Sequence, residues 1–136
     1  MLARREHSEK EIRRKLSSNS FDAEDIDTVL SQLKSEGLQS DSRFAEAFVH
    51  SRVLKGYGPA HISQELRQRG VADDIVDISL NDAGLDWLEL LAQVREKKFG
   101  GRLPKDYQEQ ARQSRFLHYR GFSGEQIRRL FNKEIE

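Results

Sequence analysis

One pattern of apolar residues returns three times along this 136-residue chain, at intervals of about fifty residues. The apolar positions of the full pattern follow one another in steps of 4, 5, 5 and 4 residues. They are Ile12, Leu16, Phe21, Ile26 and Leu30, then Ile62, Leu66, Val71, Val76 and Leu80, and finally Leu117, Phe122, Ile127 and Phe131, with Gln113 in the leading place of the third copy. A helical unit of this size cannot bury its apolar face alone, so it must stack on its neighbours. The pattern predicts an elongated, curved array that offers a binding surface rather than a catalytic pocket.

The composition agrees with such an array and excludes several kinds of site. Hydrophobic residues make up only 36% of the chain and charged residues 34%, which suits an elongated body better than one thick core. Cysteine is absent, which excludes disulfides and thiolate chemistry and fits a reducing cytoplasm. No apolar run approaches the roughly 20 residues that span a bilayer, and residues 1–10 are too charged for a signal peptide. We therefore expect a cytoplasmic protein.

The formal net charge of zero hides a strong segregation of charge along the chain. Residues 22–46 and 73–89 are mainly acidic, whereas residues 95–120 carry eight basic side chains against three acids. The bases of that segment are Arg95, Lys97, Lys98, Arg102, Lys105, Arg112, Arg115 and Arg120. These segments are either ordinary solvated helix faces or functional faces of opposite sign, and the sequence leaves both interpretations open.

Helix boundary signals predict an all-helical chain. Ser8 and Glu11 form a capping box before the first helix, and Ser123 and Gln126 form another before the last. The second helix is expected to start after Asp22 and to stop at Gly37, and the third to start at Ser40 or Asp41 with an apolar stripe. That stripe consists of Phe44, Ala47, Phe48 and Ser51.

The remaining helices are expected over residues 59–69, 73–80, a stretch after Gly84, and 105–119, with glycine and proline between them. Trp87, Leu90, Leu91 and Val94 share one face of the helix after Gly84. No alternating run of strand length is present, so no sheet is expected.

The expected helices group into three repeats, each a long helix followed by two short ones, over residues 1–38, 39–82 and 83–136. The chain enters partway through the first repeat, so residues 1–6 are interpreted as the stump of its long helix.

Several motifs resemble those of the bacterial RecX family over nearly the whole chain. They are Leu2-Ala3-Arg4-Arg5-Glu6-His7-Ser8 with Glu11-Ile12-Arg13-Arg14-Lys15-Leu16, Asp41-Ser42-Arg43-Phe44-Ala45 with Phe48-Val49 and Ser51-Arg52, the junction Lys55-Gly56-Tyr57-Gly58-Pro59 with Ile62, Glu65-Leu66 and Gly70-Val71, and Arg115-Phe116-Leu117 with Tyr119-Arg120-Gly121-Phe122 and Ile127. The sequence departs from the family in its short first helix and in Ala72, which stands where Asp22 and Ser123 cap the other repeats.

The resemblance implies a regulator without catalytic activity of its own. RecX-like proteins bind the RecA recombinase filament on DNA and mostly inhibit its ATPase, strand-exchange and coprotease activities, within homologous recombination, DNA repair and the SOS response. By this resemblance we expect the RecA filament as partner, weak contact with DNA, no membrane, no small-molecule substrate and a monomer.

The sequence offers no catalytic, cofactor or metal site. No phosphate-binding loop is present, and Gly56-Tyr57-Gly58 is interpreted as a hinge because it lacks the strand and third glycine of a dinucleotide site. The four histidines lack metal-ligand spacing. The acidic pairs at residues 25, 27, 73 and 74 suit helix N-termini. No cofactor or metal is therefore expected.

Two basic patches are the candidate partner contacts. On an ideal helix Arg112, Arg115 and Tyr119 lie within about 60° of one another, and a second patch surrounds the central junction. The full candidate set is Arg52, Lys55, Tyr57, Arg67, Lys97, Lys98, Arg112, Arg115, Tyr119 and Arg120. Arg69 and Arg13 rank lower because Glu65 and Glu9 lie four residues before them and offer local ion pairs.

Tyr57 is expected to be available for contact, so that Tyr57→Ala leaves stability nearly unchanged. Gly58 is expected to be structural if its backbone needs a positive φ.

The alternative function is a helical DNA-binding module, because three-helix units with a glycine turn resemble helix-turn-helix domains. The sequence pI of about 6.9 argues against strong autonomous DNA binding.

Overall fold

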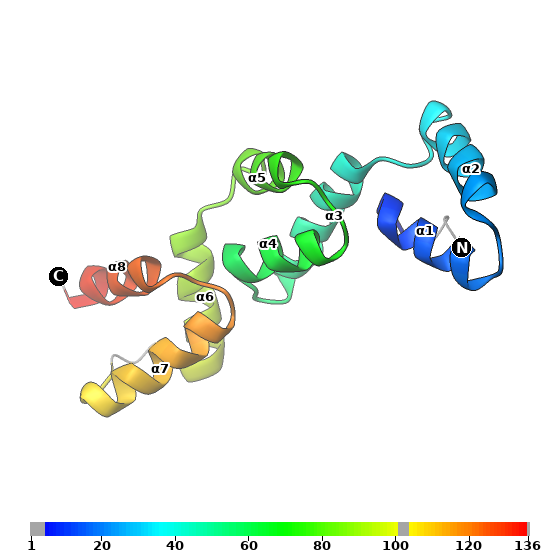
Figure 1. Ribbon diagram of the computed structural model, residues 1–136. Helices are drawn as coiled ribbons and strands as arrows, with labels where there is room; N and C mark the ends of the chain where they lie inside the picture. The colour runs from blue at the N-terminus through cyan, green and yellow to red at the C-terminus, as the bar shows by residue number, and fades with distance from the viewer. Residues whose placement is uncertain (1–4, 101–103, 136) are drawn as a thin grey trace. The chain divides into compact units, whose positions relative to one another are not determined.

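The computed structural model describes residues 5–100 and 104–135, with side chains described as far as Asn132. This part of the chain holds eight α-helices and no strand, which confirms the predicted all-helical repeats (Figure 1). The helices are α1 (Glu9–Ser18), α2 (Ala23–Ser35), α3 (Asp41–Leu54), α4 (Pro59–Gln68), α5 (Asp73–Asp82), α6 (Trp87–Phe99), α7 (Tyr107–Tyr119) and α8 (Gly124–Ile135).

The helices begin where the predicted capping residues stand. The Ser8 hydroxyl accepts a hydrogen bond from the Glu11 amide while the Glu11 carboxylate accepts one from the Ser8 amide, and Ser123 and Gln126 make the same pair before α8. The Asp22 carboxylate accepts from the Asp25 amide. Ala72 makes no side-chain cap. Short-range polar contacts thus satisfy free amides at the starts of α1, α2 and α8, but not at the start of α5.

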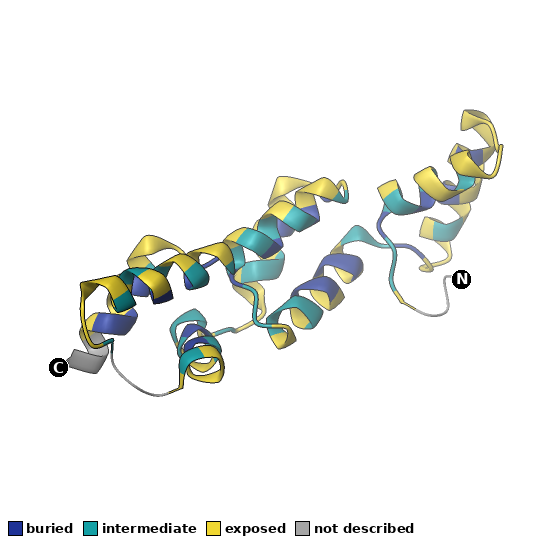
Figure 2. Cartoon of the chain, turned by 90° about the horizontal axis from the view of Figure 1, so that it is seen from below, coloured by how far each residue is buried: buried dark blue, intermediate teal, exposed yellow. Residues whose placement is uncertain are grey.

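The chain forms two compact units, which cut across the repeats. Unit 1 consists of Met1–His50 and Glu65–Ala83, and unit 2 of Ser51–Gln64 and Gly84–Glu136. Each helix that contributes to a core presents a buried side and an exposed side (Figure 2), as the sequence periodicity requires.

The core of unit 1 combines register positions of the first two repeats with buried residues of α3. Ile12, Ile26 and Leu30 form one cluster, against which Leu16 and Leu33 pack in part. In α3 the predicted stripe is partly wrong, because Ala47 is exposed and the buried residues are Phe44, Ala45, Phe48 and Val49. The buried face of α3 thus runs along adjacent pairs of residues.

The core of unit 2 is one cluster that joins α6, α7 and α8. Its buried members are Leu91, Leu117, Phe122, Ile127, Leu130 and Phe131. Trp87 packs against this cluster but remains partly exposed. The cluster holds α7 in place, and α7 carries the candidate partner residues Arg112, Arg115 and Tyr119.

The first repeat departs from the register at Phe21. This side chain is 49% exposed, whereas its equivalents Val71 and Phe122 are 4% and 1% exposed. In the third repeat the leading helix α6 supplies part of the cluster that buries Phe122. The interpretation of residues 1–6 as a helical stump is wrong for Arg5 and Glu6, which are not helical, and residues 1–4 lie outside the described residues.

Candidate partner-binding surface

A backbone contact between Gly58 and Gly121 holds the start of α4 against the turn that follows α7 in unit 2. The Gly58 amide donates to the Arg120 carbonyl at 2.7 Å, and the Ala60 amide donates to the Gly121 carbonyl at 3.0 Å. A Cβ on Gly58 would lie 2.6 Å from the Gly121 backbone. Gly58 is therefore structural because of this close approach and not because of a positive φ, which belongs to Gly56 and Gly121 instead.

Unit 1 contains a comparable contact between equivalent segments, with side chains as the donors in place of backbone amides. Ser8 donates a hydrogen bond from Oγ to the Arg69 carbonyl at 2.9 Å, and Lys10 donates from Nζ to the Gln68 carbonyl at 3.1 Å. A Cβ on Gly70 would lie 2.7 Å from Lys10 Cβ. The start of one repeat's second helix thus receives the glycine turn of the next repeat in both units.

The Arg120 side chain joins the two predicted basic patches. Its guanidinium lies 4.8 Å from the centre of the Tyr57 ring and donates to the Lys55 carbonyl at 3.3 Å. The Tyr57 ring also stacks on His61, with the ring centres 4.2 Å apart and an interplanar angle of 11°. Tyr57 is consequently half-buried and held in place, rather than freely projecting.

The same alternation of cations and rings continues along α6 and α7. Arg120 also lies 5.4 Å from the Phe116 ring, and Lys98 lies 5.2 Å from that ring. Phe116 meets Phe99 edge to face at 5.4 Å, and Arg112 lies 5.1 Å from Phe99. We define the cation–aromatic strip as Tyr57, His61, Lys98, Phe99, Arg112, Phe116 and Arg120.

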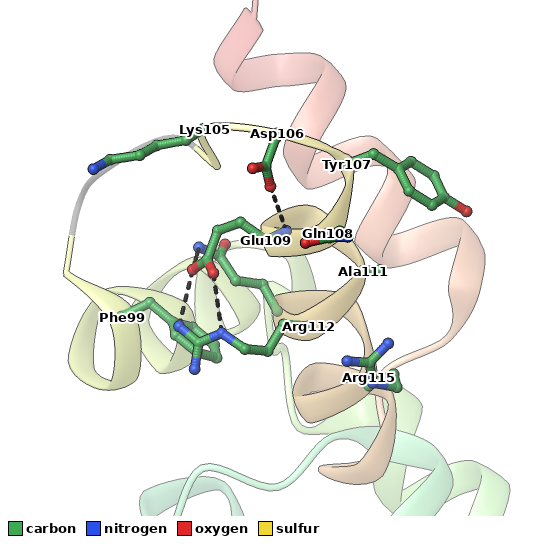
Figure 3. A pocket seen from close by; sticks show the side chains of 10 residues that line it. Phe99, Lys105, Asp106, Tyr107, Gln108, Glu109, Ala111, Arg112 and Arg115 are labelled. Carbon is green, nitrogen blue, oxygen red and sulfur yellow. Dashed lines mark hydrogen bonds and ion pairs between the residues drawn. The ribbon is translucent and has the colours of Figure 1, made fainter.

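An open groove of about 870 Å³ lies over the first half of α7, at the Arg112 end of this strip (Figure 3). We call it the α7 groove, and its lining residues are Phe99, Lys105, Asp106, Tyr107, Gln108, Glu109, Ala111, Arg112, Gln113 and Arg115. Tyr107 is 83% exposed, and Tyr119, at the other end of α7, is 81% exposed. Large exposed aromatics beside arginines are a composition typical of binding surfaces.

Arg112 and Glu109 form a bidentate ion pair in the groove. The two guanidinium-to-carboxylate distances are 3.0 and 2.9 Å (Figure 3). The hydrogen bond from Arg112 lowers the pKa of Glu109, with a further hydrogen bond from Gln113, and the bond to Glu109 raises the pKa of Arg112. The pair is therefore ionised throughout the neutral range. The rank given to Arg112 above Arg69 and Arg13 assumed that it lacked a local acid, and this assumption is wrong.

Gln113, at the leading register position of the third repeat, accepts a hydrogen bond from a buried arginine. Gln113 and Arg95 are each 2% exposed, and Arg95 donates from Nε to Gln113 Oε1 at 2.9 Å. Arg95 also lies 5.5 Å from the Phe131 ring, and the Gln113 amide donates to Glu109 at 3.2 Å. An apolar residue at position 113 would leave the guanidinium of Arg95 without this acceptor.

The structure brings most of the predicted residues to unit 2. Tyr57, Lys98, Arg112 and Arg120 lie in the strip, and Arg115 in the groove. The other members of the set in unit 2 are Arg52, Lys55, Lys97 and Tyr119. Arg67 belongs to unit 1, where it forms an ion pair with Asp73 at 2.9 Å.

Sequence reasoning missed three members of the strip, namely His61, Phe99 and Phe116. These side chains come from α4, α6 and α7, and only the fold places them beside the predicted cations. For Phe99 and Phe116 the signal in the sequence was the basic residue directly before each ring, Lys98 and Arg115. Neither neighbour of His61 is basic, so this residue carries no such signal.

Within the described residues, no group of three or more His, Cys, Asp or Glu side chains has a geometry that holds a metal ion. No described helix combines the length and the hydrophobicity that a membrane crossing requires.

Known proteins match this sequence over most of its length. A regulatory protein RecX of Halorhodospira halophila is 49% identical over 128 residues, which are 94% of this chain and 80% of the relative. The chain belongs to the RecX family. Its models match in three places: the first RecX three-helix domain at residues 1–33, the second at 40–80 and the third at 85–131. A regulatory protein RecX of Ectopseudomonas mendocina is 48% identical over 96% of this chain and 87% of the relative.

Two crystal structures of RecX proteins share the fold. RecX from Lactobacillus salivarius aligns with a TM-score of 0.82 and 23% identity, over 97% of this chain and 88% of that one. A second regulatory protein RecX aligns with a TM-score of 0.78 and 21% identity, over 96% of this chain and 66% of that one. These likenesses extend the RecX assignment from sequence to three-dimensional fold.

Proposed function

We propose that this RecX-family chain binds the RecA recombinase filament on DNA and modulates it, mostly by inhibiting its recombinase, ATPase and coprotease activities. The family membership and the relatives named regulatory protein RecX support a regulatory role. The chain acts in this proposal by binding and without catalysis of its own, as a monomer in the cytoplasm.

The observation that carries the proposal is the cation–aromatic strip with the adjoining α7 groove. Arginine and tyrosine dominate binding energy at protein interfaces, because each offers a large contact area together with polar groups. The strip draws on three helices that the unit 2 core and the Gly58–Gly121 contact hold in place. A surface fixed in advance loses less conformational entropy when it binds.

The exposed part of this surface is predominantly cationic. Glu109 is occupied by Arg112 and Gln113, and Asp106 caps the Glu109 amide. Arg115 is exposed and has no ion pair with any other described residue. Acidic protein surface and phosphate are the partner chemistries that such a surface favours.

The test is a RecA ATPase assay on single-stranded DNA, with increasing amounts of this protein, beside a titration of the protein with the same DNA alone. We expect ATP hydrolysis to fall at concentrations at which DNA alone is not bound. Unchanged hydrolysis, together with no binding of the protein to sedimented filaments, would contradict the proposal.

Direct nucleic-acid binding is the second candidate function, and one observation favours it. Tyr107, Ala111, Arg115 and Tyr119 follow one another in steps of four residues along α7, with both tyrosine rings highly exposed. Exposed rings with cations between them suit the stacking of bases and the binding of phosphates in single strands. In this case the DNA titration alone would show binding that weakens as salt rises, with a slope of about 0.7 per phosphate contact.

A further inference from the structure

In two repeats of this chain, residues at the start of the second helix bind the glycine turn of the following repeat. We call this binding place the socket and the bound turn its guest. In the first repeat, Ser8 and Lys10 hold the turn at Gly70. In the second, Gly58 and Ala60 hold the turn at Gly121. Both guests are the ends of helices, because α4 ends at Gln68 and α7 at Tyr119. In both cases the guest offers carbonyl oxygens, which the socket meets with hydrogen-bond donors.

At the corresponding place on the third repeat, no helix end is bound among the described residues. The register that relates Ile62 to Gln113 relates the socket residues Gly58, Ala60 and His61 to Glu109, Ala111 and Arg112. All three of these equivalents line the α7 groove. The groove therefore lies where the other two repeats hold the end of a helix.

We propose that the α7 groove is a docking site for the C-terminal turn of a helix that ends in glycine and belongs to a partner protein. The proposed function supplies the identity of that partner, the RecA filament. The partner helix would take the place that the Gly70 and Gly121 turns take on α1 and α4.

The donors of the groove are side chains, as in the first repeat, and not the backbone amides of the second repeat. Helix α7 begins at Tyr107, before the register position of Glu109, so the Glu109 and Gln110 amides already donate to Asp106. The groove presents Lys105, Arg112 and Arg115 in their place. The last turn of a helix carries free carbonyl oxygens and the negative end of the helix dipole, so its charge complements these cations.

The requirement for glycine follows from the filled sockets. A Cβ on Gly121 would lie 2.5 Å from His61 Cβ, and Gly121 has a φ of 103°. Within this chain the glycine turns at Gly70 and Gly121 already occupy sockets, and the equivalent residue of the first repeat is Ser20, with a φ of 71° and a Cβ. Helix α2 ends in a turn at Gly37, with a φ of 72° and no described atom within 4 Å of an added Cβ, so a second copy of the chain is the competing guest. The crosslinking experiment below distinguishes it from the RecA filament.

The first experiment places a photoreactive benzoylphenylalanine at position 108 of the full chain, in place of Gln108, and irradiates the protein on RecA filaments assembled on single-stranded DNA. His118 is the matched control position, because it is exposed on α7 but does not line the groove. We expect crosslinking from position 108 to exceed that from position 118 at least fivefold and to map to a glycine-ended helix terminus of RecA. Crosslinks that map to another part of RecA, to DNA or to a second copy of the chain would overturn the inference.

The second experiment fills the groove with Ala111→Trp and compares it with His118→Trp, which adds the same side chain outside the groove. We expect Ala111→Trp to weaken filament binding at least tenfold and His118→Trp to change it less than twofold, with both circular dichroism spectra unchanged. If Ala111→Trp does not fold, Arg115→Glu gives the same readout from an exposed position.

The two proposals fail in distinguishable ways. If the wild-type chain does not bind the filament, the proposed function is wrong. If the wild type binds and a folded variant with an altered groove binds equally well, only the groove inference is wrong.

Discussion

The first and third repeats share one apolar register but differ in what covers it. In the third repeat, Phe122 is buried in a cluster to which α6 contributes. In the first repeat, Phe21 is half exposed, and the described residues before α1 form no helix. The turns differ in parallel, because Gly121 lies against His61 whereas the first repeat has Ser20 at that place. Whether a register residue is buried therefore depends on its neighbours in space and not on its place in the repeat alone.

The same comparison explains where glycine is required. Gly37 in the first repeat has a φ of 72°, but a Cβ added there would meet no described atom within 4 Å, whereas Gly121 has both a positive φ and a close neighbour. Backbone strain acts at both positions, and steric exclusion only at Gly121.

The largest expected effect comes from the pair Phe122→Ala and Phe21→Ala. Removing the buried ring of Phe122 leaves a cavity and should lower the free energy of unfolding by about 3 to 5 kcal/mol. Removing the half-exposed ring of Phe21 should cost less than about 1.5 kcal/mol, since much of it already contacts solvent. Urea denaturation followed by circular dichroism measures both. Equal losses would show that the first repeat covers Phe21 after all.

The next comparison is Gly121→Ala with Gly37→Ala. Alanine at Gly37 should cost about 1 to 2 kcal/mol for its left-handed backbone. At Gly121 the contact with His61 should add about 1 to 3 kcal/mol for overpacking. Thermal and urea unfolding give the two values, and a loss at Gly37 as large as that at Gly121 would contradict a steric contribution from His61.

A double-mutant cycle tests why Gln113 stands at an otherwise apolar register position. Gln113→Leu should cost about 1 to 3 kcal/mol, because Arg95 loses an acceptor in a buried place. In the background of Arg95→Met the same change should cost much less, which measures the coupling between the two side chains. Additive losses would mean that the hydrogen bond between them contributes nothing to stability.

The smallest expected effect concerns Glu9 in the first repeat, whose carboxylate pairs with Lys34 of α2 at 3.0 Å. The hydrogen bond from Lys34 lowers the pKa of Glu9. Its contribution is therefore present above the unfolded-state pKa of about 4.3 and is lost as the pH falls through the lower folded-state value. Glu9→Gln should cost a few tenths of a kcal/mol at pH 7, given the exposure of the pair, and nothing at pH 2. A loss that persists at pH 2 would contradict this assignment.

The sequence predicted the elements of the fold that depend on local chemistry. The capping box at Ser8, the cap at Asp22 and the helix start at Pro59 all follow from hydrogen bonding or φ preferences within a few residues. The register also predicted most of the buried residues. It did not predict the exposure of Phe21 or the role of Gln113, since both depend on a neighbouring helix.

The candidate surface was predictable only in part, and for the same reason. The excess of cations in residues 95–120 identified Arg112, Arg115 and Arg120. The rings of His61 and Phe99 reach these cations only in the folded unit 2. Gly58 was recognised as structural, but its close approach to Gly121 joins residues from different repeats and leaves no local pattern in the sequence.

The most direct test of the account is RecA ATPase activity on single-stranded DNA with the wild-type chain and with the double variant Arg112→Glu, Arg115→Glu. Both side chains are exposed on α7, so the circular dichroism spectrum should not change. We expect the wild type to inhibit hydrolysis and the double variant to need at least a tenfold higher concentration for the same inhibition. Equal inhibition by the two proteins would contradict the claim that the α7 surface meets the filament.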